Sequence, residues 1–125
     1  MPYPKTLMTA SRKQAEKGDC TVLATCVATG LSYDEVHKAF TRAGRRRRRG
    51  CTTYIVSKAL SILGYKHETV KKWKGKTFTS ITLPRDSCYI IYSVDHAAGV
   101  KFGLVKDWAS EKRLRVTEVW KISRK

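Results

Sequence analysis

The sequence has few acidic residues and no long apolar run. Ten aspartates and glutamates stand against 26 lysines and arginines, so the 125-residue chain has a formal net charge of +16. No stretch approaches the roughly 18 to 20 apolar residues of a transmembrane helix, and residues 1–5 lack the apolar core of a signal peptide. We therefore expect a protein that stays in the cytoplasm in which it is made.

The cysteines lack the spacing of a metal site or of a disulfide framework. Cys20, Cys26, Cys51 and Cys88 are irregularly spaced, and no C-x-x-C pair occurs. Without a secretion signal, this pattern indicates reduced thiols rather than disulfide bonds, and a zinc site is not expected. A glycine-rich phosphate loop is also missing. We predict neither a metal nor another cofactor.

The residues that are present suit one folded domain. A chain of 125 residues, 42% of them hydrophobic, is long enough for one core and too short for two. We therefore take residues 1–125 as a single domain, in which residues 1–13 form a basic N-terminal arm and residues 45–50 form an arginine-rich loop.

Three helices are predicted in the first half of the chain. Asp19 is a good N-cap for a segment that is almost entirely apolar or small, which indicates a buried helix. Ser32 and Glu35 have the spacing of a capping box for a second helix, and a third starts at Thr52 or Thr53. Each of the three ends at a glycine: Gly30, Gly44 and Gly64.

The second half of the chain predicts an antiparallel sheet. Alternating apolar residues and turn signals define its strands. Helices followed by antiparallel strands are an α+β arrangement, with N-terminal helices packed on a C-terminal sheet. The expected strands are residues 65–70, residues 88–94, a hairpin of residues 96–102 and 104–108 that turns around residues 101–103, and residues 115–122.

Cys20 is the residue that we single out for chemistry. It falls in the first turn of the predicted buried helix, where the helix dipole stabilises an anion and a thiol ionises more readily. His96 opens a later strand, and a tight turn brings Asp107 opposite His96 or one residue away, where a carboxylate orients the imidazolium. An imidazolium near Cys20 favours a thiolate–imidazolium pair. The alternative is a buried structural cysteine, with a half-buried strand histidine and an exposed carboxylate.

This chain order resembles that of papain-like cysteine peptidases, where a cysteine opens a buried helix and a histidine and then an aspartate or asparagine follow. The segments are most similar to the compact bacteriocin-processing (double-glycine) peptidases and to small papain-like proteins of tailed phages. The resemblance covers roughly residues 14 to 108. The segments that carry it are Gly18-Asp19-Cys20-Thr21-Val22, Gly30-Leu31-Ser32-Tyr33-Asp34-Glu35, Asp95-His96-Ala97 and Val105-Lys106-Asp107-Trp108.

The resemblance implies a papain-like fold with Cys20 as nucleophile, His96 as general base and Asp107 as orienting residue. In such folds a glutamine shortly before the nucleophile helps to form the oxyanion hole, and Gln14, six positions before Cys20, fits that spacing. The implied activity is that of a small cytoplasmic thiol hydrolase, a peptidase with a peptide or protein substrate. A catalytically silent papain-like protein that only binds is the alternative.

The excess of basic residues predicts contact with a polyanion. Arginine pairs bidentately with phosphate, and an aromatic residue among lysines can stack on an unpaired base. No motif for reading base sequence is present, so we expect backbone contacts to a nucleic acid or ribonucleoprotein. A solvated face is the alternative reading of each cluster. The candidate residues are Arg45, Arg46, Arg47, Arg48, Arg49, Lys71, Lys72, Trp73, Lys74 and Lys76.

Three functions therefore stand side by side. The first is the thiol hydrolase, with the basic surface as a docking device. The second is the silent papain-like protein that binds nucleic acid or a ribonucleoprotein. The third is a phage-type effector in the host cytoplasm that binds or cleaves a host protein. The sequence does not indicate an oligomeric state.

Overall fold

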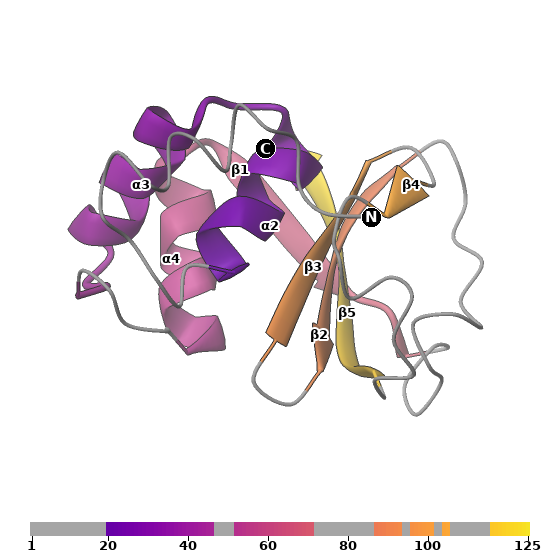
Figure 1. The fold of residues 1–125 in the computed structure, drawn as a ribbon. Coiled ribbons are helices and arrows are strands. Elements are labelled where there is room, and N and C mark those ends of the chain that lie inside the picture. The colour runs from indigo at the N-terminus through magenta and orange to yellow at the C-terminus, as the bar shows by residue number, and fades with distance from the viewer. Residues whose placement is uncertain (1–19, 47–51, 72–86, 94–95, 102–103, 106–115) are drawn as a thin grey trace.

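A computed structural model describes residues 20–46, 52–71, 87–93, 96–101, 104–105 and 116–125. Within these residues, three helices precede an antiparallel sheet, which confirms the α+β arrangement (Figure 1). None of the described helices is long and apolar enough to cross a membrane. The elements are α2 (Cys20–Thr29), α3 (Tyr33–Arg42), α4 (Thr53–Ile62), β1 (Tyr65–Thr69), β2 (Cys88–Ser93), β3 (His96–Lys101), β4 (Leu104–Val105) and β5 (Val116–Arg124).

The helix boundaries lie where the capping residues predict them. Ser32 Oγ accepts the N–H of Glu35 at 3.3 Å at the start of α3, and Thr52 Oγ1 accepts the N–H of Ile55 at 3.4 Å at the start of α4. These bonds satisfy backbone donors that the first helical turn leaves without partners. The three predicted glycines follow the helices in left-handed conformations, with φ of 77° at Gly30, 111° at Gly44 and 87° at Gly64. The predicted N-cap Asp19 lies outside the described residues.

Helix α2 is buried along almost its whole length, as its composition predicts. Residues 21–28 are all buried. Two of its threonines keep their hydroxyl groups satisfied within the helix: Thr25 donates to the carbonyl of Thr21 at 2.8 Å, and Thr29 donates to the carbonyl of Thr25 at 2.7 Å. Such bonds to the preceding turn allow a polar side chain to lie in an apolar core without an orphaned hydroxyl.

The strand order of the sheet is β1-β5-β2-β3-β4, and every neighbouring pair is antiparallel. The last strand of the chain therefore lies between β1 and β2. The register shifts between Tyr92 and Ser93, since Tyr92 pairs with Glu118 and Ser93 pairs with Val116. Thr117, the extra residue of this bulge, donates its hydroxyl to the carbonyl of Tyr92 at 3.2 Å.

The β3–β4 hairpin lies where the sequence predicts it. Lys101 pairs with Leu104, and Val100 pairs with Val105. Both pairs fall within the predicted strands of residues 96–102 and 104–108, and Lys101, which the prediction also assigned to the turn, is the last residue of β3.

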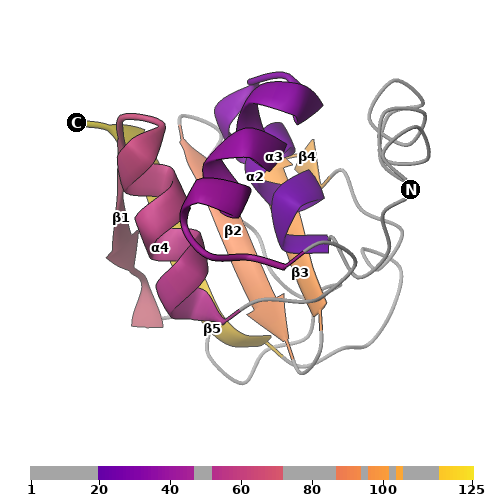
Figure 2. The same cartoon turned by 90° about the vertical axis from the view of Figure 1, so that its left-hand side faces the viewer.

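The helices cover one face of the sheet (Figure 2). Large side chains fill the layer between the helices and the sheet, where Phe40, Leu60 and Trp120 are at most 3% exposed. The opposite face is buried as well, at Tyr89, Ile91, Val100 and Val119. The sheet residues that pack against the helices are Ile90, Tyr92, Ala97, Trp120 and Ile122.

Candidate active site

Cys20 is one of the two half-buried end residues of α2, and it packs against the edge of the hydrophobic core. It is the first residue of α2 and is half-buried, whereas the eight residues after it are buried. The first turn of α2 contains no acidic residue, so within α2 nothing opposes the positive end of its dipole. The described cysteines Cys20, Cys26 and Cys88 form no disulfide. A nucleophile needs a fixed backbone and a side chain that is not fully buried, and Cys20 meets both conditions.

Helix α2 lies directly against strand β3, and Gly99 is the point of contact. A Cβ atom at Gly99 would collide with the carbonyl oxygen of Ala24 and would lie 2.7 Å from Cβ of Val27. No side chain fits into that space, so β3 can approach the helix backbone this closely only with glycine at this position. The contact therefore fixes the position of α2 along β3.

The first residues of α2 and β3 lie at the same end of these two elements. Figures 1 and 2 show the helix and the strand running in the same direction. Cys20 precedes the Ala24–Gly99 contact by four residues, about 6 Å along a helix, and His96 precedes it by three residues, about 10 Å along a strand. Cys20 and His96 are therefore on the same side of this contact, although 75 residues separate them in the sequence.

The other predicted catalytic residues lie wholly or partly outside the described part of the chain. Gln14 and Asp107 lie outside the described residues, and so does the side chain of His96. The backbone of His96 is described: it is the first residue of β3 and pairs with Ser93. Among the described residues, no group of three or more histidine, cysteine, aspartate or glutamate side chains is placed to hold a metal ion.

The predicted nucleic-acid residues divide into buried, exposed and undescribed ones. Arg45 is only 4% exposed, so the first residue of the arginine-rich loop is neither free to contact a phosphate backbone nor part of a solvated face. Its backbone N–H donates to the carbonyl of Phe40 at 2.9 Å, which ties Arg45 to the end of α3. Arg46 and Lys71 are exposed. Outside the described residues lie Arg47, Arg48, Arg49, Lys72, Trp73, Lys74 and Lys76.

His67 on β1 forms a polar contact that the sequence does not signal. Its Nε2 atom lies 2.9 Å from the hydroxyl of Ser57 on α4, and its ring stacks on Trp120 with centroids 3.7 Å apart and planes 8° from parallel. Burial lowers the pKa of His67, and the nearby carboxylate of Glu118 opposes this only in part. The neutral imidazole joins α4 to the sheet.

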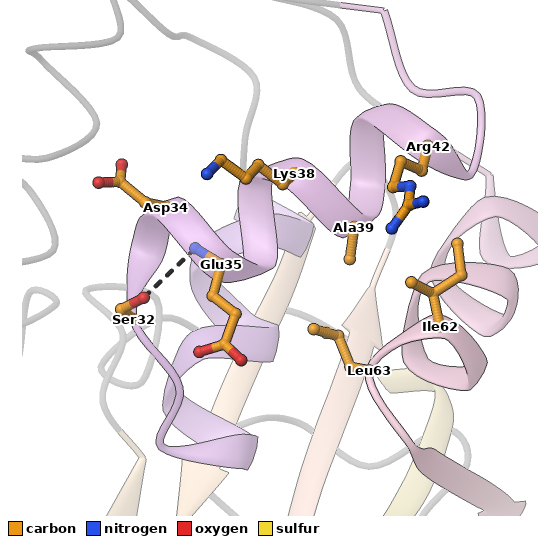
Figure 3. A pocket seen from close by; sticks show the side chains of 8 residues that line it. All are labelled: Ser32, Asp34, Glu35, Lys38, Ala39, Arg42, Ile62 and Leu63. Atoms are coloured by element: carbon orange, nitrogen blue, oxygen red, sulfur yellow. Dashed lines mark hydrogen bonds between the residues drawn. The ribbon is translucent and has the colours of Figure 1, made fainter.

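A groove lies between α3 and α4 (Figure 3), and Cys20 is not among the residues that line it. Its volume is about 430 Å³, within the range of small-molecule sites. Ala39, Ile62 and Leu63 form its apolar wall (Figure 3). Its remaining lining is a mixture of acidic, basic and hydroxyl side chains, without a cysteine or histidine. The groove therefore lacks the nucleophile and the base that thiol chemistry requires.

No protein-family model matches this sequence, no curated protein matches it, and no solved structure matches its fold. The papain-like resemblance therefore rests on the residues of this chain alone. What the chain shows by itself is an α+β domain in which an accessible cysteine opens a buried helix beside a strand that starts with a histidine.

Proposed function

We propose that this protein is a small papain-like thiol hydrolase, a peptidase in which Cys20 is the nucleophile. The observation that carries the proposal is the packing of α2 on β3 at Gly99, which sets the accessible cysteine and the strand that begins with His96 at one end of the domain. The order of helices and sheet supports it further, because papain-like proteins place the nucleophile on an N-terminal helix and the base on the sheet.

In this mechanism each residue of the predicted site has a defined role. The sulfur of Cys20 attacks the scissile carbonyl carbon as a thiolate while His96 holds the proton, and His96 then gives that proton to the leaving amine. The resulting thioester is hydrolysed by a water molecule that His96 deprotonates. Asp107 orients the imidazole. The side-chain amide of Gln14 and the backbone N–H of Cys20 bind the oxyanion.

The reactivity of the thiols tests this proposal. We expect iodoacetamide to modify Cys20 at least about tenfold faster than Cys26 or Cys88 at neutral pH, because a thiolate rather than a thiol attacks the reagent. Peptide mass spectrometry after timed quenching gives the rate at each cysteine. Cys88 is the matched control, since it is half-buried like Cys20 but lies in a strand.

A second variant separates activation from accessibility. Replacing His96 with alanine should reduce the rate at Cys20 to that at Cys88, whereas the rate at Cys88 should not change. Equal rates at Cys20 and Cys88 in the unmodified protein would refute the thiol hydrolase. Fast modification of Cys20 that survives His96→Ala would show an accessible cysteine without a base.

A second candidate function is polyanion binding through the basic surface, with the same fold and no catalysis. The exposure of Arg46 and Lys71 favours it, together with the formal charge of +16. Neutralising phosphates releases counterions, so binding would weaken steeply as salt rises. On this proposal, a nucleic acid is held by its backbone.

The salt dependence of binding tests the second function. We expect the affinity for a labelled duplex, measured by fluorescence anisotropy, to fall by at least about tenfold between 50 and 200 mM salt. Cys20→Ala should bind as the unmodified protein does, because the thiol takes no part. An affinity that stays constant over this range would contradict backbone recognition.

A further inference from the structure

The outer face of α4 presents a tyrosine to solvent. Tyr54, in the first turn of α4, is 72% exposed. Two large hydrophobic side chains are exposed among the described residues, and Tyr54 is the more exposed of them. The opposite face of the helix carries Val56, Ala59 and Leu60, all 0% exposed. The tyrosine is therefore not needed to anchor α4, since three other side chains do so.

Cations follow Tyr54 along the same face. Lys58 lies one turn further on and is exposed, about 6 Å along the helix axis. Another turn on, Ser61 Oγ lies 2.6 Å from Nζ of Lys125, which brings a second ammonium group to this face from the end of β5. We call Tyr54, Lys58, Ser61 and Lys125 the α4 stripe.

The α4 stripe is basic without local compensation. Helix α4 contains no acidic residue, and the side-chain contact of the Lys125 ammonium group is with the hydroxyl of Ser61 rather than with a carboxylate. No carboxylate of α4 itself therefore offsets these charges. An aromatic ring beside uncompensated cations is the combination by which proteins hold unpaired nucleotides, with the ring stacking on a base and the cations contacting phosphates.

We propose that the α4 stripe binds single-stranded nucleic acid, with Tyr54 stacking on an unpaired base and Lys58 and Lys125 contacting phosphates. This inference rests on the second candidate function. It adds that the nucleic acid is single-stranded rather than a duplex, and it names the residues that bind it. A duplex conceals the faces of its bases, so only a single strand gains from Tyr54. The stripe shares no residue with the arginine-rich loop or with the lysines around Trp73.

The test is a comparison of strand states in three variants of the full chain. The probes are a short labelled oligouridine and a labelled RNA duplex of the same length, with affinity measured by fluorescence anisotropy. We expect Tyr54→Ala to weaken oligouridine binding by about tenfold, because a stacking contact is lost. Duplex binding should weaken by less than about twofold, because the substitution removes no phosphate contact. Tyr54→Phe keeps the ring and should bind as the unmodified protein does. Ile62→Ala, which shortens the other exposed large hydrophobic side chain of α4, is the matched control and should have no effect.

The outcomes distinguish this inference from the function on which it rests. Salt-sensitive binding that Tyr54→Ala leaves unchanged would overturn the stacking role and leave polyanion binding intact. An equal loss for oligouridine and duplex would also overturn it. Absence of binding to both probes at low salt would overturn both proposals. Tighter binding of polyglutamate than of oligouridine, with the same dependence on Tyr54, would assign the stripe to an acidic protein instead.

Discussion

Gly99→Ala is expected to destabilise the protein by about 1–3 kcal/mol, the usual range for forcing a methyl group into a filled core. The new Cβ would collide with the carbonyl oxygen of Ala24 and press on Val27. A backbone oxygen cannot move away as a side chain does, so either α2 or β3 must shift. Urea unfolding, followed by the fluorescence of the tryptophans, measures the loss in the free energy of unfolding.

A second glycine provides the control for this substitution. Gly64 has open space around its Cβ position but a φ of 87°, so Gly64→Ala reports the strain of a left-handed residue without a collision. In Gly99→Ala the rate of alkylation at Cys20 should fall as well, because the shift separates the starts of α2 and β3. In Gly64→Ala that rate should not change. A Gly99→Ala protein as stable as the unmodified one would show that the helix and strand are not in this contact.

Trp120→Ala is expected to remove about 3–5 kcal/mol, since it deletes a large aromatic side chain from the core. Trp120 is 3% exposed, stacks on His67 and meets the Tyr92 ring edge-on with centroids 5.1 Å apart. Because β5 lies between β1 and β2, the cavity would open in the middle of the sheet. Thermal unfolding measured by circular dichroism should show a large drop in Tm. Trp120→Phe keeps a ring against His67 and should lose less.

The same substitution changes how stability depends on pH. Burial lowers the pKa of His67 from its ordinary value of 6.5, so the unfolded chain takes up a proton at a higher pH than the folded protein. Stability is therefore complete above about pH 6.5 and is lost as the pH falls below it towards the lowered pKa. Trp120→Ala admits water to the imidazole and should reduce this acid-induced loss. His67→Gln, which does not titrate, should show the smallest loss, and an unchanged pH profile in that variant would assign the acid sensitivity to other groups.

The helices and most of the strands follow from the sequence because their signals are local. A hydroxyl residue before each of α3 and α4, a glycine after all three, and apolar side chains at helical spacing define the helix boundaries. The alternating residues of β5 define a strand in the same way. The sequence assigned Lys101 both to a strand and to the turn of the β3–β4 hairpin, because its pairing with Leu104 depends on the partner strand and not on local composition.

The candidate site was predictable only in part. The sequence identifies Cys20 and His96 as residues of interest. That they lie on the same side of the α2–β3 contact depends on the packing of Gly99, which is tertiary structure and has no local signal at either residue. The small residues Ala97, Ala98 and Gly99 within a strand were the available signal, since such a run indicates close approach of another backbone. Arg45 shows a different error. A charge run is solvated on average, but its first residue here is buried, and its backbone N–H bonds to the carbonyl of Phe40 in α3.

The position of β5 between β1 and β2 sets an order of assembly. Strands β2 and β3 pair from Ser93 and His96 onward and need only a short loop closure. β1 precedes both strands in the sequence, yet its one neighbour within the described sheet is β5. It can join only after the chain has been synthesised through β5, across about 50 intervening residues. Pairings of this sequence separation are slow to form, so we expect the helices and the β2–β3 hairpin to collapse first and the closure of β5 to limit the folding rate.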